Sequence, residues 1–165
     1  MKQPLYFVHI PKSGGTSVYQ AMRTLYGRGM CPHRLWRQLG KVGPNGARKY
    51  VAFAGHFYLT LDRFLNVQTQ KFTVLRDPVE RAISHLEHIL GEEAHHLHLY
   101  FTRSGNVEDM ILSTVGRELF SNFQVKMLSR SPNVAAIIER LSAEQIEARG
   151  IELEVEHVSD ATPAQ

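Results

Sequence analysis

A short apolar segment near the start of the chain ends abruptly in a loop that contains two glycines. Leu5–Ile10 (LYFVHI) is almost entirely apolar and aromatic and stops at a proline, which is typical of a buried strand. Pro11–Ser17 (PKSGGTS) has the composition of a loop, and Val18–Leu25 has a helical pattern with Thr16 or Ser17 as the expected N-cap. The order strand, glycine-rich loop, helix predicts a backbone that can hold an anionic group at the helix start.

This loop carries the residue types that bind phosphate or sulfate. Gly14 and Gly15 allow the backbone to turn tightly and to approach an anion closely, and Lys12 adds a full positive charge. Hydroxyl donors are contributed by Ser13, Thr16 and Ser17. The nucleoside-triphosphate pattern G-x-x-x-x-G-K-[ST] is absent because the lysine precedes the glycines, which disfavours magnesium-dependent hydrolysis of ATP or GTP. A plain strand-to-helix turn is the alternative for a glycine pair alone.

Two further apolar segments predict additional strands. Val51–Ala54 ends in Gly55-His56, and Lys71–Leu75 (KFTVL) ends in Arg76-Asp77-Pro78, after which Val79–Leu90 has a helical pattern. Strands that alternate with helices predict an α/β domain, here a P-loop-like three-layer fold with a mainly parallel central sheet flanked by helices. Ligands of such sheets bind at the carboxyl ends of the strands.

The other segments fit a single domain. The length of 165 residues suggests one domain, which we assign to residues 1–158, with 159–165 as a frayed tail. The expected elements are a loop over Arg28–Lys49 with a short helix around Arg34–Leu39, an irregular segment Glu92–Asn106, helices Val107–Val115 and Arg117–Leu128 broken near Gly116, an amphipathic helix Asn133–Ala148 and an alternating strand Ile151–Val158. The last strand is expected at a sheet edge or in a dimer contact.

A second candidate anion site follows the third apolar segment. Arg76 lies at its end, and Arg81 and Ser84 lie three residues apart on one face of the next helix. The Arg76 guanidinium can bind two oxygens of an anion while the Ser84 hydroxyl binds a third. Asp77 is expected to cap the helix that starts at Pro78. A surface Arg-Asp pair with an ordinary cap is the alternative.

Together these segments resemble a known family. FVHIPKSGGTS (7–17) and FTVLRDPVERAISHL (72–86) are similar to the two cofactor signatures of the sulfotransferases that use 3′-phosphoadenosine 5′-phosphosulfate (PAPS), most closely those of the branch of carbohydrate 2-O-sulfotransferases and their bacterial relatives. The resemblance implies that Lys12, Ser13, Gly14, Gly15, Thr16 and Ser17 hold the 5′-phosphosulfate, and that Arg76 and Ser84 hold the 3′-phosphate. It extends to Leu128, so we expect the family fold to be shortened at its C-terminal end.

Two shorter segments also resemble that branch. They are Ala54–Phe57 (AGHF) and Asn122–Leu128 (NFQVKML). The resemblance implies in-line transfer of a sulfuryl group from PAPS to a hydroxyl of a carbohydrate or other small acceptor. Lys12 would stabilise the charge that builds on the leaving phosphate oxygen. His56 would accept the acceptor's proton, for which an imidazole suits neutral pH. No metal is expected to be required.

The charge of the chain is unevenly distributed. The formal net charge is +3, with 17 Lys and Arg against 9 Asp and Glu up to Ile138, and 2 against 7 from Glu139 onward. The excess of positive charge up to Ile138 suits an anionic ligand. An ordinary solvated surface explains this excess equally well. The histidines from His85 to His98 are expected at solvated helix and loop positions rather than in a zinc site.

The sequence also gives expectations about the location and the partners of the protein. Cys31 is the one cysteine, no apolar run could span a membrane, and the first residues have no signal-peptide core, so the cytoplasm is the expected location. The resemblance to the bacterial relatives of the branch implies a bacterial protein. The expected partner is a small-molecule or carbohydrate acceptor rather than a nucleic acid, and a homodimer is one option. The alternatives to a sulfotransferase are a kinase-like phosphotransferase of related fold and a catalytically weak nucleotide-binding module.

Overall fold

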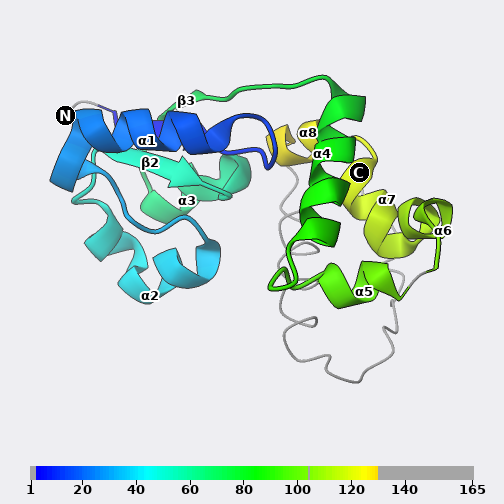
Figure 1. The fold of residues 1–165 in the computed structure, drawn as a ribbon. Helices are drawn as coiled ribbons and strands as arrows, with labels where there is room; N and C mark the ends of the chain where they lie inside the picture. Colours follow the sequence, from blue (N-terminus) through cyan, green and yellow to red (C-terminus); the bar gives the residue numbers. More distant parts are fainter. Residues whose placement is uncertain (1–2, 104, 130–165) are drawn as a thin grey trace, which may run out of the picture.

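A parallel sheet of three strands organises the first half of the protein. The computed structural model describes residues 3–103 and 105–129. In it, β1 (Leu5–Val8) lies between β2 (Ala52–Gly55) and β3 (Gln70–Phe72), and both pairings are parallel (Figure 1). Parallel neighbours need crossover connections, and helices provide them here. The predicted α/β fold with a mainly parallel sheet is therefore confirmed.

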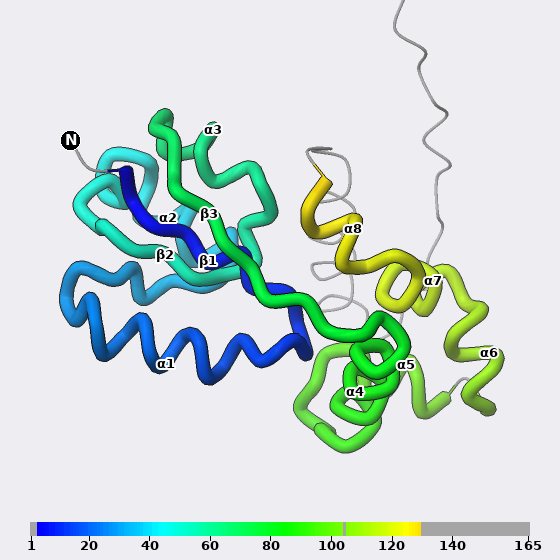
Figure 2. Tube along the Cα trace, turned by 90° about the horizontal axis from the view of Figure 1, so that it is seen from above, coloured from blue at the N-terminus to red at the C-terminus, as the bar shows by residue number. Residues whose placement is uncertain are grey.

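Helices cover both faces of this sheet, which gives the fold three layers (Figure 2). Side chains alternate along a strand. Tyr6 and Val8 therefore pack on one face, and Phe7 packs on the other. The covering helices are α1 (Gly15–Tyr26) on the Phe7 side, and α2 (Trp36–Ala47) and α3 (Leu61–Leu65) on the Tyr6 side. Short 3₁₀ turns, η1 (Gly27–Gly29) and η2 (Tyr58–Thr60), lie in the connections.

A helical part of the domain follows β3. Its helices are α4 (Pro78–Gly91), α5 (His98–Thr102), α6 (Val107–Leu112), α7 (Thr114–Phe120) and α8 (Phe123–Leu128). They surround a second hydrophobic core that includes Ile89, Phe101 and Met127. Leu128 packs against this core and also against the core beneath the sheet. Helix α8 therefore joins the helical part to the sheet.

The first helix begins earlier than the sequence predicts. It starts at Gly15 rather than at Val18, and neither Thr16 nor Ser17 is its N-cap. The N-cap is Gly14, whose φ of 75° is a left-handed conformation that glycine adopts without steric cost. Thr16 and Ser17 instead lie in the first turn, where main-chain N–H groups have no partner within the helix.

Other predicted boundaries change for local reasons. The helix predicted at Arg34–Leu39 continues to the end of α2 across a kink at Gly43, where φ is 72°. Glu92–Asn106, predicted as irregular, contains α5. The break expected near Gly116 lies instead at Ser113, because the Ser113 hydroxyl accepts a hydrogen bond from the Gly116 N–H and caps α7. The helix predicted over Arg117–Leu128 is also divided, into α7 and α8, at Asn122, where φ is 50°.

The structure does not test the predictions for the C-terminal part of the chain. The helix Asn133–Ala148, the strand Ile151–Val158 and the tail 159–165 lie outside the described residues. All the candidate site residues lie within the described part of the chain. Each helix in 3–103 and 105–129 is too short or too polar to cross a lipid bilayer.

Candidate functional site

The loop between β1 and α1 forms a main-chain cradle at the carboxyl end of the sheet. Lys12 and Gly14 both have a left-handed backbone, with φ of 68° and 75°. This conformation is uncommon for lysine, and such strain concentrates at functional sites. Ser13 is 3% exposed, and its hydroxyl has no hydrogen-bond partner among the described residues. An unpaired buried hydroxyl costs free energy, and a ligand that accepts its hydrogen bond removes that cost. The Ser13 hydroxyl is therefore a donor that suits an anionic ligand.

A close contact between Gly15 and His9 fixes the shape of this cradle. A Cβ atom added to Gly15 would lie 1.8 Å from Nε2 of His9. Any larger residue would therefore displace the imidazole or the start of α1. His9 is itself held by Arg34, whose Nη2 donates to Nδ1 of His9 at 3.1 Å. The second glycine of the loop is thus required by packing rather than by its backbone angles.

His56 follows β2 at the same edge of the sheet. Its Nδ1 lies 2.8 Å from the main-chain oxygen of His9, and its ring stacks on the His9 ring with centroids 4.6 Å apart. Since a carbonyl oxygen can only accept, Nδ1 carries the proton and Nε2 carries the lone pair. Burial lowers the pKa of His56 to about 4. His56 is therefore a neutral imidazole at neutral pH, with its lone pair on Nε2.

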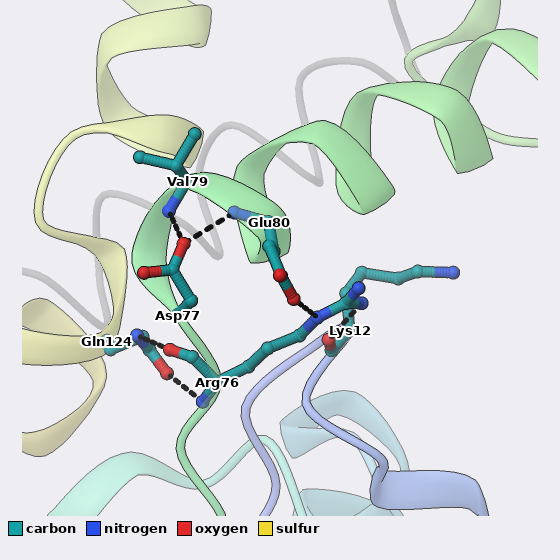
Figure 3. A network of polar contacts seen from close by, with 6 residues as sticks. All are labelled: Lys12, Arg76, Asp77, Val79, Glu80 and Gln124. Atoms are coloured by element: carbon teal, nitrogen blue, oxygen red, sulfur yellow. Dashed lines mark hydrogen bonds and ion pairs between the residues drawn. The ribbon is translucent and has the colours of Figure 1, made fainter.

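Arg76 brings the second candidate site next to the first. Its Nη1 donates to the main-chain oxygen of Lys12 at 3.5 Å, and its Nε donates to the Glu80 carboxylate at 3.3 Å (Figure 3). Asp77 caps α4 as predicted, because its Oδ1 accepts from the N–H groups of Val79 and Glu80, each at 3.0 Å. The two segments that the sequence singled out, 64 residues apart, are thus in direct contact.

A comparison with known protein families identifies the family of this protein. The model of the sulfotransferase family matches residues 1–130. The chain belongs to the sulfotransferase family. No curated protein and no solved structure gives a significant match. The match covers both candidate anion-binding segments, as well as His56 and the Asn122–Leu128 segment, and it supports a sulfotransferase activity for the protein.

Ser84 and Arg81 have different positions in this sulfotransferase. Ser84 is half-buried on α4, four residues after Glu80 and so on the same helical face, but it makes no hydrogen bond to Arg76 in the described structure. Arg81 is 1% exposed, and its Nη2 donates to the main-chain oxygen of Leu119 at 2.8 Å. Arg81 therefore stabilises the helical core, and the shared face predicted for Arg81 and Ser84 does not bring both to the anion site.

The histidines from His85 to His98 do not form a metal centre within residues 3–103 and 105–129, where no group of His, Cys, Asp or Glu is arranged to hold a metal ion. His85 is 7% exposed and lies 3.3 Å from Nη1 of Arg81 through its Nδ1. The rings of His95 and His96 stack with centroids 4.5 Å apart. These contacts explain the cluster by packing, although His85 is more buried than the sequence predicts.

Buried neutral histidines make the stability of this sulfotransferase sensitive to acid. Burial lowers the pKa of His9 and His85 to about 3 and that of His56 to about 4, against about 6.5 in an unfolded chain. Below pH 6.5 the unfolded state binds more protons, so the free energy of unfolding falls as pH falls. We expect a loss of about 2 kcal/mol per histidine, and so up to about 6 kcal/mol for the three, between pH 7 and pH 5 in urea unfolding. A constant unfolding free energy over that range would contradict this assignment.

Proposed function

We propose that this sulfotransferase takes PAPS as its donor and transfers the sulfuryl group to a hydroxyl of a carbohydrate or other small acceptor. The observation that carries the proposal is the contact between Arg76 and the main chain of Lys12. It joins two candidate anion sites, and PAPS has an anionic group at each of its 5′ and 3′ positions. A donor with a single anionic end would not need both.

The residues present fit the two ends of such a donor. At the 5′ end, the unpaired Ser13 hydroxyl, the free N–H groups at the start of α1 and the Lys12 ammonium are suited to oxyanions. At the 3′ end, Arg76 is exposed, and its guanidinium is held by an exposed glutamate that an incoming phosphate can replace. Ser84 lies one turn after Glu80 on the same face of α4 and completes the proposed set.

Each residue of the site has a distinct chemical role in this proposal. PAPS supplies a sulfuryl group bonded to a phosphate leaving oxygen. The Lys12 ammonium stabilises negative charge at that oxygen, because a fixed cation needs no reorganisation. His56 accepts the proton of the acceptor hydroxyl on Nε2, while its Nδ1–H stays bonded to the His9 carbonyl. The ring is therefore held in the basic tautomer before the acceptor arrives.

Binding measurements without turnover test the donor assignment. Calorimetry should show that the protein binds 3′-phosphoadenosine 5′-phosphate (PAP) more tightly than 5′-AMP, since only PAP carries the 3′-phosphate. Arg76→Ala should reduce that preference by about 10- to 100-fold, because a hydrogen bond to a charged group contributes about 1.5–3 kcal/mol.

The control is Arg63→Ala, which removes an exposed arginine of α3. It should leave the preference for PAP unchanged. Equal affinities of the unmodified protein for PAP and 5′-AMP would reject the 3′-phosphate site.

A further inference from the structure

The segment that carries Arg76 has left the sheet. β3 ends at Phe72, three residues before the predicted end of this strand. The Thr73 hydroxyl still donates to the main-chain oxygen of Val8 at 2.8 Å, which holds the segment beside β1. Within residues 3–103 and 105–129, no strand pairs with the chain at Arg76. The main-chain N–H and C=O groups of Arg76 are therefore available to partners other than a strand.

A single side chain supplies both partners. Oε1 of Gln124 accepts from the Arg76 N–H at 3.1 Å, and Nε2 of Gln124 donates to the Arg76 carbonyl oxygen at 2.7 Å (Figure 3). The pairing fixes the orientation of the carboxamide, since only its oxygen can accept and only its nitrogen can donate. Gln124 thus bonds to Arg76 as a residue of an adjacent strand would.

The helix that bears Gln124 is firmly anchored. Phe123 and Met127, on either side of Gln124 in α8, are 4% and 1% exposed in the helical core. The same helix is tied to α7 by Lys126, whose ammonium donates to the Glu118 carboxylate at 2.9 Å. The carboxamide is therefore a fixed reference point for the main chain of Arg76.

The guanidinium of Arg76 is held much less firmly. Its partner Glu80 has a side chain that is 65% exposed, and exposed ion pairs stabilise little. Its bond to Lys12 is 3.5 Å long, at the limit of a hydrogen bond. These side-chain contacts are weak. The direction in which the Arg76 side chain leaves the backbone therefore depends on the two hydrogen bonds between Gln124 and the main chain of Arg76.

We infer that Gln124 is a positioning residue for the 3′-phosphate of the donor, acting through the backbone of Arg76. This inference rests on the proposed function. Gln124 need not touch the donor. It holds the main chain so that the guanidinium meets the phosphate without first having to be ordered, and a preordered contact binds more tightly.

The test compares the affinities for PAP and 5′-AMP in Gln124→Met, which keeps the length of the side chain and removes both hydrogen bonds. The ratio of the two affinities should fall by about 3- to 10-fold, while 5′-AMP binding stays within about 2-fold. Val125→Ala is the matched control, because it changes an exposed side chain of the same helix that neither anchors α8 nor contacts Arg76. It should leave the ratio unchanged. Gln124→Asn, whose amide is too short to reach both groups, serves if the methionine variant is insoluble.

A double-mutant cycle separates positioning from general stabilisation. In an Arg76→Ala background, Gln124→Met should no longer change the PAP to 5′-AMP ratio, because the guanidinium it positions is absent. An additional loss of the same size in that background would overturn the inference, as would an unchanged ratio in Gln124→Met alone. Failure of the unmodified protein to prefer PAP would overturn the proposed function as well, so the two failures are distinguishable.

Discussion

Replacing His56 by alanine should lower kcat by about 10²- to 10⁴-fold while PAP affinity changes by less than about 2-fold. The expected loss follows from the site geometry. Nδ1 of His56 is bonded to the His9 carbonyl, so Nε2 is the nitrogen that can accept a proton. The measurement is the rate of PAP formation from PAPS at a saturating concentration of a hydroxyl acceptor, with PAP affinity measured by calorimetry.

The control for this experiment is His33→Ala, a histidine of the loop that precedes α2. It should retain nearly full activity. Full activity of His56→Ala would assign the base to another residue, for which buried His85 is the next candidate. The low pKa of His56, about 4, also predicts a pH–rate profile that is flat from neutral pH down to about pH 5 and falls below it.

Lys12→Ala should lower kcat by about 10²- to 10³-fold and the affinity for PAPS, measured without acceptor, by less than about tenfold. The difference between the two effects is expected because the leaving oxygen gains most of its charge in the transition state. Lys41→Ala, which removes an exposed lysine of α2, is the control and should change neither quantity. If Lys12→Ala lowered kcat no more than it lowered PAPS affinity, the lysine would be a binding residue only.

The first strand and its loop could be predicted because their signals are local. A six-residue apolar segment, a proline and a glycine pair all lie within Leu5–Gly15, so no distant contact was needed to recognise them. The Asp77 cap was predictable for the same reason, since the aspartate directly precedes Pro78. The N-cap of α1 was not, because the backbone of Gly14 outweighs the side-chain preferences of Thr16 and Ser17.

The contacts that assemble the site lie far apart in the chain. Gln124 and Arg76 are 48 residues apart, and His9 and His56 are 47 apart. No periodic pattern in the sequence predicts contacts between residues so far apart. The family resemblance marked the segment that contains Gln124, but not the residue it bonds. The burial of Arg81 could not be predicted, because helical spacing gives its neighbours on the helix and not which face the core covers.

One calorimetric experiment on the unmodified protein tests the central claim most directly. Titration with PAP in the absence of magnesium should show tight binding at a single site, and titration with ATP and magnesium should show much weaker binding. A kinase-like phosphotransferase would give the opposite order, because its phosphate loop and metal select the triphosphate. Tighter binding of magnesium ATP than of PAP would contradict the assignment of PAPS as the donor.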